Sequence, residues 1–189
     1  MRNKDLLITI GIIVLVLVIL GGMYNGLVKR DVAVTTAWAQ VENVLQRRAD
    51  LIPNLVSSVK GYMKHEQEIL DNLAKARASY TGAQTVDEKM KAGALMEGAL
   101  ARLLAIVENY PSLKANETFN RLMDELAGTE NRIAVERKKY NEAVQDLNTT
   151  IRRVPWNIIA NFFKFQAKPF FEAEAGAKAV PKVDFGTEN

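Results

Sequence analysis

Residues 34–80 read VTTAWAQVENVLQRRADLIPNLVSSVKGYMKHEQEILDNLAKARASY, and apolar side chains recur among them alternately four and three positions apart. Side chains at that spacing share one face of an α-helix. Twelve of the fourteen positions in this stripe are apolar or aromatic. We therefore expect a long helix whose striped face is buried in a helical core. The stripe comprises Val34, Trp38, Val41, Leu45, Arg48, Ile52, Leu55, Val59, Tyr62, Glu66, Ile69, Leu73, Ala76 and Tyr80.

Pro53 lies inside this stripe. A proline in a helix interior removes one backbone hydrogen bond and kinks or breaks the helix. A reversal of the chain would need a turn and would reset the phase of the stripe, whereas the phase is the same on both sides of Pro53. No glycine occurs between Gly26 and Gly61. We expect one kinked helix from Tyr24 to Tyr80, with a reversal at Pro53 as the alternative.

The chain upstream of the stripe is strongly apolar. Residues 6–23 read LLITIGIIVLVLVILGGM and contain no charged side chain. As a helix this run would be roughly 27 Å long, close to the thickness of a bilayer core. A signal peptide has a shorter apolar region and a small-residue cleavage site, which GGMYNGLVKR does not provide. The sequence predicts a short tail over 1–5 and a single-pass helix in the cell membrane over 6–23.

The charges beside this segment do not assign its orientation. Arg2 and Lys4 precede it, and Lys29 and Arg30 follow it. Orientation follows the excess of Lys and Arg on one side, and here the two counts are equal. The side of the membrane on which the remaining chain lies is left open.

Capping signals mark two further helices. Thr85 and Glu88 have the spacing of a capping box and begin a helix that should stop before Pro111. Asn116 is a good N-cap for a third helix, which we expect to end at Val154. Strand-like alternation is absent from the sequence. The fold class is therefore all-α, with a bundle of long helices over 24–155 behind the membrane helix.

An aromatic segment follows the bundle. Residues 156–171 read WNIIANFFKFQAKPFF and contain five of the seven phenylalanines. Four basic residues and no acidic ones lie between Arg152 and Phe171, which suits an anionic membrane surface. The alternative is a cap on the end of the bundle. Counting helix directions favours a cap at the end far from the membrane, with a short helix and an irregular tail over 156–189.

Several blocks of the chain resemble the LemA family. They read NGLVKRDVAVTTAWAQVENVLQRRADLIPNLVSSVKGYMKHE, YPSLKANETFNRLMDELAGTENRIAVERKKYNEAV and FFEAE…PKVDF. Ala49 stands where the family commonly has an aromatic residue, and Phe163-Lys164-Phe165 departs from the usual Gly-Phe. The resemblance covers almost the whole chain after the apolar segment. It does not extend to the sensor kinase that has shared the name, because the chain has neither its length nor its nucleotide-binding motifs.

The resemblance implies an up-and-down four-helix bundle behind one N-terminal membrane helix, in the bacterial cell envelope. It also implies a short N-terminus outside and the bulk of the chain in the cytoplasm. It brings no established molecular activity with it.

Composition excludes several kinds of chemistry. The chain has no cysteine, which excludes disulfides, thiol nucleophiles and Cys-ligated metal centres. Its one histidine, His65, has Tyr62 three residues before it, so the Glu-x-x-His motif of di-iron bundles is missing. The net charge is +3, with basic and acidic residues interspersed, which does not resemble a nucleic-acid-binding surface. We predict no catalytic, cofactor-binding or metal-binding residues.

One polar cluster is a candidate site. We expect a polar seam between helices or a surface for a partner, comprising Glu130, Asn131, Arg132, Arg137, Tyr140 and Asn141. The leading functional hypothesis is a membrane-anchored scaffold or adaptor without catalytic activity. The alternative is a ligand-binding or enzymatic bundle that uses this cluster.

Helix lengths also suggest self-assembly. The second helix is too short to return to the membrane, so about 50 Å of the first helix would form an uncovered stem. Exposed apolar surface of that kind favours association of copies anchored side by side. We expect a homo-oligomer, and other membrane proteins are further candidate partners. The candidate contacts are Gly22, Gly26, Val34, Trp38, Val41 and Leu45.

Overall fold

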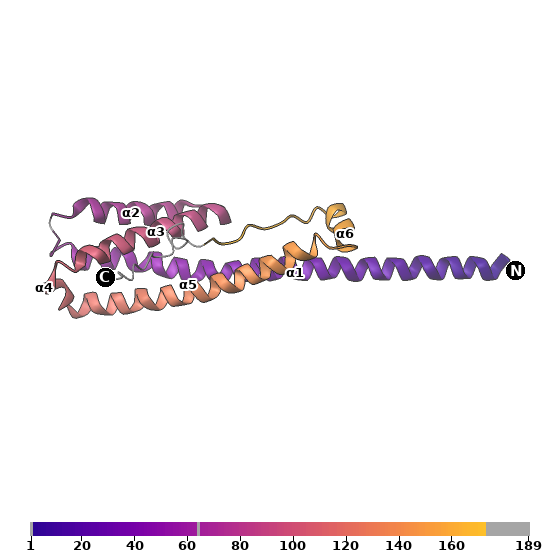
Figure 1. Cartoon of the computed structure of the whole chain (residues 1–189), viewed down its shortest axis with the longest axis horizontal. Helices are drawn as coiled ribbons and strands as arrows, with labels where there is room; N and C mark the ends of the chain where they lie inside the picture. Colours follow the sequence, from indigo (N-terminus) through magenta and orange to yellow (C-terminus); the bar gives the residue numbers. More distant parts are fainter. Residues whose placement is uncertain (1, 64, 173–189) are drawn as a thin grey trace, which may run out of the picture.

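The computed structural model describes residues 2–63 and 65–172, and this part of the chain contains helices without any strand (Figure 1). Four long helices run alternately up and down, and the first extends far beyond the others. The predicted all-α, up-and-down four-helix architecture is confirmed. In chain order the helices are α1 (Arg2–Val59), α2 (Gln67–Gly82), α3 (Val86–Val107), α4 (Pro111–Lys114), α5 (Glu117–Thr150) and α6 (Trp156–Phe162).

The predicted stripe forms the core-facing side of α1. All eight stripe positions between Val34 and Val59 are buried, and Leu55 and Val59 are fully enclosed. Such burial stabilises the fold by roughly 25 cal/mol for each Å² of apolar surface removed from water. The prediction that the striped face is buried in a helical core is therefore confirmed for the part of the stripe that lies in α1.

The expected single helix from Tyr24 to Tyr80 is wrong. α1 ends at Val59, and α2 begins at Gln67 and returns along the bundle. The stripe persists because α2 packs on the same core through Leu70, Leu73, Ala76 and Tyr80. Two antiparallel helices that face one core can carry the same period, so periodicity did not reveal the turn.

Pro53 does not reverse the chain, because α1 continues through it for six more residues. In a regular helix the N–H of residue 53 would donate to the carbonyl of Ala49, and proline has no such N–H. Arg77 Nε of α2 donates to that carbonyl oxygen instead, at 2.9 Å. The buried acceptor is therefore satisfied by the neighbouring helix, and α1 tolerates the proline.

Both predicted caps are present. Thr85 and Glu88 form a complete capping box at the start of α3. The side chain of Asn116 accepts a hydrogen bond from the Phe119 N–H at the start of α5. α5 ends at Thr150, four residues before the predicted end.

The predicted stem is covered by its own chain, which contradicts the argument for stem contacts between copies. α5 packs along α1 in the most extensive helix contact of the bundle. Its C-terminal end reaches Arg30, whose Nε lies 3.0 Å from Asp146 Oδ2. The reversal after Val59 turns α5 back toward the N-terminal part of α1, and the predicted contacts Val34, Trp38, Val41 and Leu45 are buried within this chain. Self-assembly itself is not tested by a single chain and stays a prediction.

The expected cap at the far end of the bundle is also wrong. α6 lies beside α1 near Leu27, at the end of the bundle from which the exposed part of α1 projects (Figure 1). Ile159 and Ala160 form a small second core there with Leu27. The additional reversal explains this position, because it changes the end at which α5 finishes. The irregular tail predicted beyond residue 172 lies outside the described residues.

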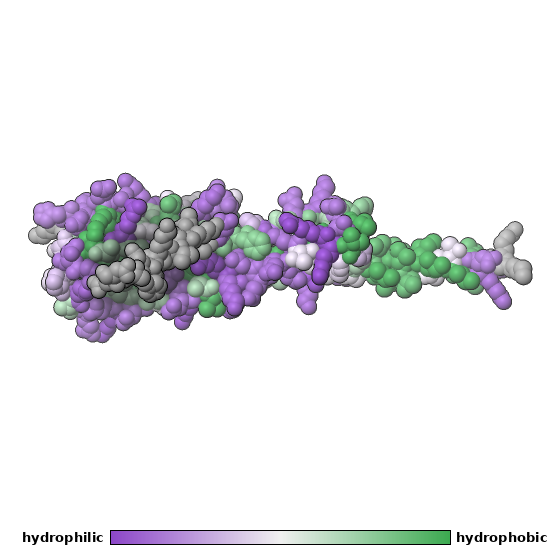
Figure 2. Space-filling view, viewed as in Figure 1, coloured by the Kyte–Doolittle hydropathy of each residue, from purple (hydrophilic) through white to green (hydrophobic). Residues whose placement is uncertain are grey.

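The N-terminal part of α1 is a candidate membrane span by its length and composition. Its large apolar side chains are exposed from Leu6 to Leu20. Figure 2 shows this hydrophobic surface along the projecting part of the helix. The surface of the bundle is mostly hydrophilic in the same view.

Candidate functional site

The predicted polar cluster begins with an ion pair between α1 and α5. Arg48, which interrupts the apolar stripe, is 2% exposed. Its guanidinium pairs with the carboxylate of Glu130, and its Nε lies 3.5 Å from Thr129 Oγ1. A buried cation requires such partners because burial without them costs several kcal/mol. The pair therefore fixes how α5 aligns with α1.

The same helix holds the chain that follows α6 through two asparagines. Asn148 donates to the carbonyl of Lys168 and accepts from its N–H, both at 2.9 Å. Asn141 makes the corresponding pair with Phe171, at 3.0 and 2.8 Å. Each carboxamide thus binds both the N–H and the carbonyl of one backbone residue, as a neighbouring β-strand would. We call residues 163–172 the strap.

The spacing of these contacts follows from helix and strand geometry. Asn141 and Asn148 are seven residues apart, which corresponds to about 10.5 Å along a helix. Lys168 and Phe171 are three residues apart, which corresponds to about 10 Å in an extended chain. The two rises match, so an extended strap can pair with one face of α5 at both positions.

Tyr140 adds an aromatic and a polar contact to the strap. Its hydroxyl donates to the Pro169 carbonyl at 2.9 Å, and burial raises the pKa of Tyr140 to about 12. Its ring packs edge-on against Trp38, 5.5 Å between centroids. Phe171 packs on Trp38 from the strap, and Arg137 lies over the Phe171 ring at 5.6 Å. The strap therefore completes the core beside Trp38.

The structure brings four of the six predicted cluster residues into contacts between elements. Glu130 pairs with α1, while Arg137, Tyr140 and Asn141 hold the strap. The other two, Asn131 and Arg132, are exposed on α5. Because these four side chains bind other parts of the chain, their contacts are those of a polar seam between elements rather than of a surface open to a partner. Asn148 was missing from the predicted cluster. Its position seven residues after Asn141 places both asparagines on one face of α5, and this spacing was the available signal.

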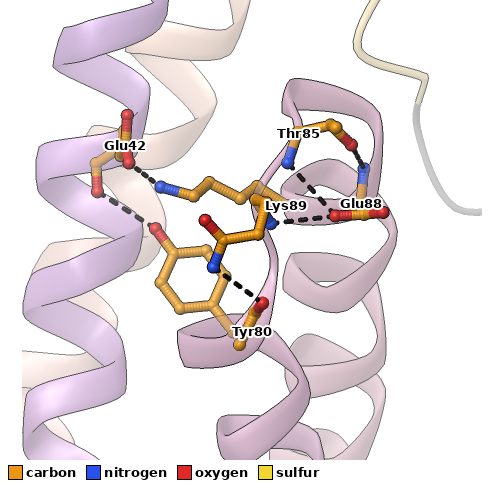
Figure 3. Close-up of polar contacts among 7 residues, drawn as sticks. Glu42, Tyr80, Thr85, Glu88 and Lys89 are labelled. Carbon is orange, nitrogen blue, oxygen red and sulfur yellow. Dashed lines mark hydrogen bonds and ion pairs between the residues drawn. The ribbon is translucent and has the colours of Figure 1, made fainter.

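A second polar contact joins the α2–α3 turn to α1 (Figure 3). Tyr80 donates its hydroxyl to the Glu42 carbonyl at 3.3 Å, and Lys89 pairs with the Glu42 carboxylate. Burial, followed by the negative charges of Glu42 and Asp50, raises the pKa of Tyr80 to about 12. These contacts fix the α2–α3 hairpin on α1.

Comparison with known proteins agrees with this architecture. A family model described as LemA family matches residues 37–185. The chain belongs to the LemA family. The matched region includes α1 from residue 37 onward, all of α2, α3 and α5, and also α6 and the strap.

This LemA protein is also similar to curated magnetosome proteins. MamQ 1 of Paramagnetospirillum magneticum is 26% identical over 175 residues, covering 79% of this chain and 64% of that protein. MamQ of Magnetospirillum gryphiswaldense is 26% identical over 180 residues, covering 81% of this chain and 66% of that protein. The chain thus spans about two thirds of the length of these relatives. Together with the helical architecture, the comparisons support a membrane-associated helical protein.

A groove runs along the outer face of the α2–α3 hairpin of this LemA protein. It has a volume of about 1080 Å³ and lies between two antiparallel helices. Its lining includes small residues and Leu95, which is 62% exposed. Lys75 and Arg102 lie on its edges. The groove is a second candidate surface that the sequence did not indicate.

The described part of this LemA protein shows no group of three side chains suited to bind a metal ion. His65 is exposed in the turn after α1, whereas the expected helix from Tyr24 to Tyr80 would have contained it.

Proposed function

We propose that this LemA protein is a membrane-anchored helical scaffold that holds its bundle at a fixed angle to the membrane. The observation that supports this most directly is the continuity of α1. The helix that exposes apolar side chains from Leu6 to Leu20 is the same helix that supplies the core stripe from Val34 to Val59. A membrane segment joined by a helix, rather than by a flexible linker, transmits its orientation to the bundle.

The polar cluster supports a scaffold more than an enzyme. Glu130 is engaged by Arg48, and Tyr140 and Asn141 are engaged by the strap. A catalytic or ligand-binding role would need these groups to be available to a substrate. Their observed partners give each of them a structural role.

The anchor is tested by membrane extraction of the full chain. We expect the protein to stay in the membrane pellet after alkaline carbonate treatment and to be released by detergent. Leu15→Arg with Ile19→Arg should release it, because each arginine at the centre of a span costs about 2.5–3.5 kcal/mol. The matched control is Val32→Arg, at an exposed position of α1 beyond the apolar run. Release of the wild-type chain by carbonate would contradict the proposal.

A second candidate function is binding of a partner helix in the α2–α3 groove. Two antiparallel helices form its walls, and it exposes Leu95 and small side chains between them. Its edges carry Lys75, Lys91 and Arg102 against one acid, Glu68. This balance favours an amphipathic helix whose apolar face is narrow and whose flanks are acidic.

This binding is tested with a fluorescent, acidic amphipathic peptide and the full chain in lipid nanodiscs. Leu95→Glu should weaken saturable binding at least tenfold, because it places a negative charge among the apolar contacts. Val135→Glu, on the exposed face of α5, is the matched control. Equal affinity of both variants would remove the groove as the binding site.

Self-assembly remains a prediction, but the predicted contact residues of the stem are buried within the chain and are not accessible to a second copy. The ring of Trp156 lies 2.7 Å from where a side-chain carbon on Gly26 would be, so this glycine serves a contact within the chain. Gly22 has open space around it. Contacts between copies would therefore involve the exposed apolar part of α1.

A further inference from the structure

The end of the bundle nearest the apolar run carries an exposed aromatic and apolar surface. Ile158 and Phe162 are four residues apart on α6 and are 64% and 78% exposed. Val154 before the helix and Phe163 after it are exposed as well. The opposite face of α6, with Ile159 and Ala160, is buried against Leu27 of α1, so this short helix carries apolar side chains on its exposed side as well as on its buried side. We call Val154, Ile158, Phe162 and Phe163 the α6 patch.

The α6 patch lies at a defined height along α1. α6 packs on α1 between Met23 and Leu27, directly after the apolar run. Four helical residues correspond to about 6 Å. The headgroup layer on each side of a bilayer core is roughly 5–7 Å thick. If the apolar run spans the core, the α6 patch therefore lies within the headgroup layer.

The contacts of α6 with α1 fix this position. Trp156 lies against Gly26, where any side-chain carbon would collide with its ring. Arg30 lies over the Trp156 ring at 5.5 Å. Tyr24 contacts Phe163 with 4.6 Å between ring centroids. Aromatic rings of this kind are enriched at the boundary between a membrane and water.

Basic side chains accompany the α6 patch. Arg152, Arg153 and Lys164 are exposed around α6, and acidic residues are absent from 152–171. Cations at this height attract the anionic headgroups of a membrane surface. The charge and the apolar surface therefore favour the same partner.

Lys164 has a backbone conformation that its side chain does not favour. The helix ends with the Phe165 N–H donating to the Ala160 carbonyl, and Lys164 has a φ of 59°. Glycine is the usual residue at this position of such a helix end. The local fold would thus prefer glycine, whereas a cation beside the α6 patch suits a surface of anionic lipid.

We infer that α6 is an interfacial helix whose patch inserts among the headgroups of an anionic membrane, beside the helix that crosses it. This inference rests on the proposed membrane anchor and adds a second attachment to it. The α6 patch enters the boundary of the acyl chains, and the three basic side chains bind lipid phosphates. With two attachments the bundle is held at one height and tilt.

The test uses single-cysteine variants of the full chain, which contains no other cysteine. Phe162→Cys, Leu15→Cys and Val135→Cys are spin-labelled and reconstituted in vesicles of phosphatidylcholine with phosphatidylglycerol. Collision with oxygen and with a water-soluble nickel chelate then reports the depth of each label. We expect a deep label at position 15, an interfacial label at 162 and an aqueous label at 135.

The outcomes separate this inference from the anchor. A label at 162 that meets the chelate as often as the label at 135, with position 15 deep, would overturn the interfacial helix alone. A label at 15 exposed to the chelate would overturn the anchor itself. Ile158→Cys serves as a second position on the α6 patch, so that loss of one phenylalanine does not decide the result.

The role of the charge is tested by adding Lys164→Gly to the Phe162→Cys variant. Glycine relieves the backbone conformation, so the helix end should remain intact. We expect the chelate collision rate at 162 to rise at least twofold in anionic vesicles and to stay unchanged in pure phosphatidylcholine. An unchanged rate in anionic vesicles would overturn the contribution of Lys164 to lipid binding.

Discussion

The contact between Arg77 and the backbone beside Pro53 predicts a measurable coupling between two helices. Arg77 Nε donates to the Ala49 carbonyl at 2.9 Å, and Ala49 is fully buried. Arg77→Leu keeps a good helix former but removes this donor. Because Pro53 supplies no N–H, the carbonyl then has no partner. A hydrogen bond from a charged group contributes about 1.5–3 kcal/mol, so the free energy of unfolding should fall by that amount.

Pro53→Ala changes this expectation. An alanine at 53 supplies the N–H that the Ala49 carbonyl lacks in the native helix. In this background Arg77→Leu should cost much less. The two substitutions should therefore show a coupling energy of about 1–2 kcal/mol in a double-mutant cycle, within the range for contacting residues.

The assay is urea unfolding of the full chain in mild detergent, followed by circular dichroism, for the four proteins of the cycle. Lys75→Leu is the matched control, since it removes an exposed cation from the same helix. We expect this control to change stability by less than about 0.5 kcal/mol in both backgrounds. An equal cost of Arg77→Leu with proline and with alanine at 53 would refute the reasoning.

Three other predictions follow from the site. Asn148→Ala should speed hydrogen exchange of the Lys168 amide by roughly 5- to 150-fold, for a loss of about 1–3 kcal/mol in two hydrogen bonds; unchanged exchange measured by NMR would contradict the role of the strap contact. Glu130→Ala should lower the urea midpoint more than Arg48→Met, because the first leaves a buried cation unpaired and the second removes the charge; the reverse order would contradict the seam. The folded-state pKa of Tyr80 is raised from 10.0 to about 12, so its contribution to stability is complete below pH 10 and is lost between about pH 10 and 12. Tyr80→Phe should reduce this loss in urea unfolding at those pH values, and an identical loss in the variant would show that Tyr80 does not cause it.

Local signals predicted much of this fold. The stripe identified α1 from Val34 to Val59, and the side chains of Thr85 and Asn116 marked the starts of α3 and α5. Each of these signals is contained within one helix. The reversal after Val59 escaped prediction because α2 buries its own stripe in the same core. The turn contains Gly61, but a single glycine does not by itself end a helix.

The candidate site was predictable only in part. Arg48 is one of the two stripe positions that are not apolar, and its partner Glu130 belonged to the predicted cluster. Periodicity could not pair the two residues, because they lie 82 positions apart. Asn148 was missed because its partner is an extended strap, which has no helical pattern to indicate where it packs. Whether Pro53 kinks or reverses the helix was also ambiguous, because the donor that replaces its missing N–H is Arg77 on another helix.

The direction of α5 connects these observations to the proposed function. One additional reversal after Val59 brings the end of α5 to Arg30, so that α6 can pack on α1 beside Gly26. The strap then returns along α5 to Trp38, which lies in the core of the bundle. In the proposed arrangement α1 and the strap both connect the level of the membrane surface to this core. A change in the depth of α6 would therefore displace side chains packed around Trp38, whereas a cap at the far end of the bundle would leave them unaffected. Mechanical connection of this kind is what a scaffold requires, and it depends on the position of a single turn.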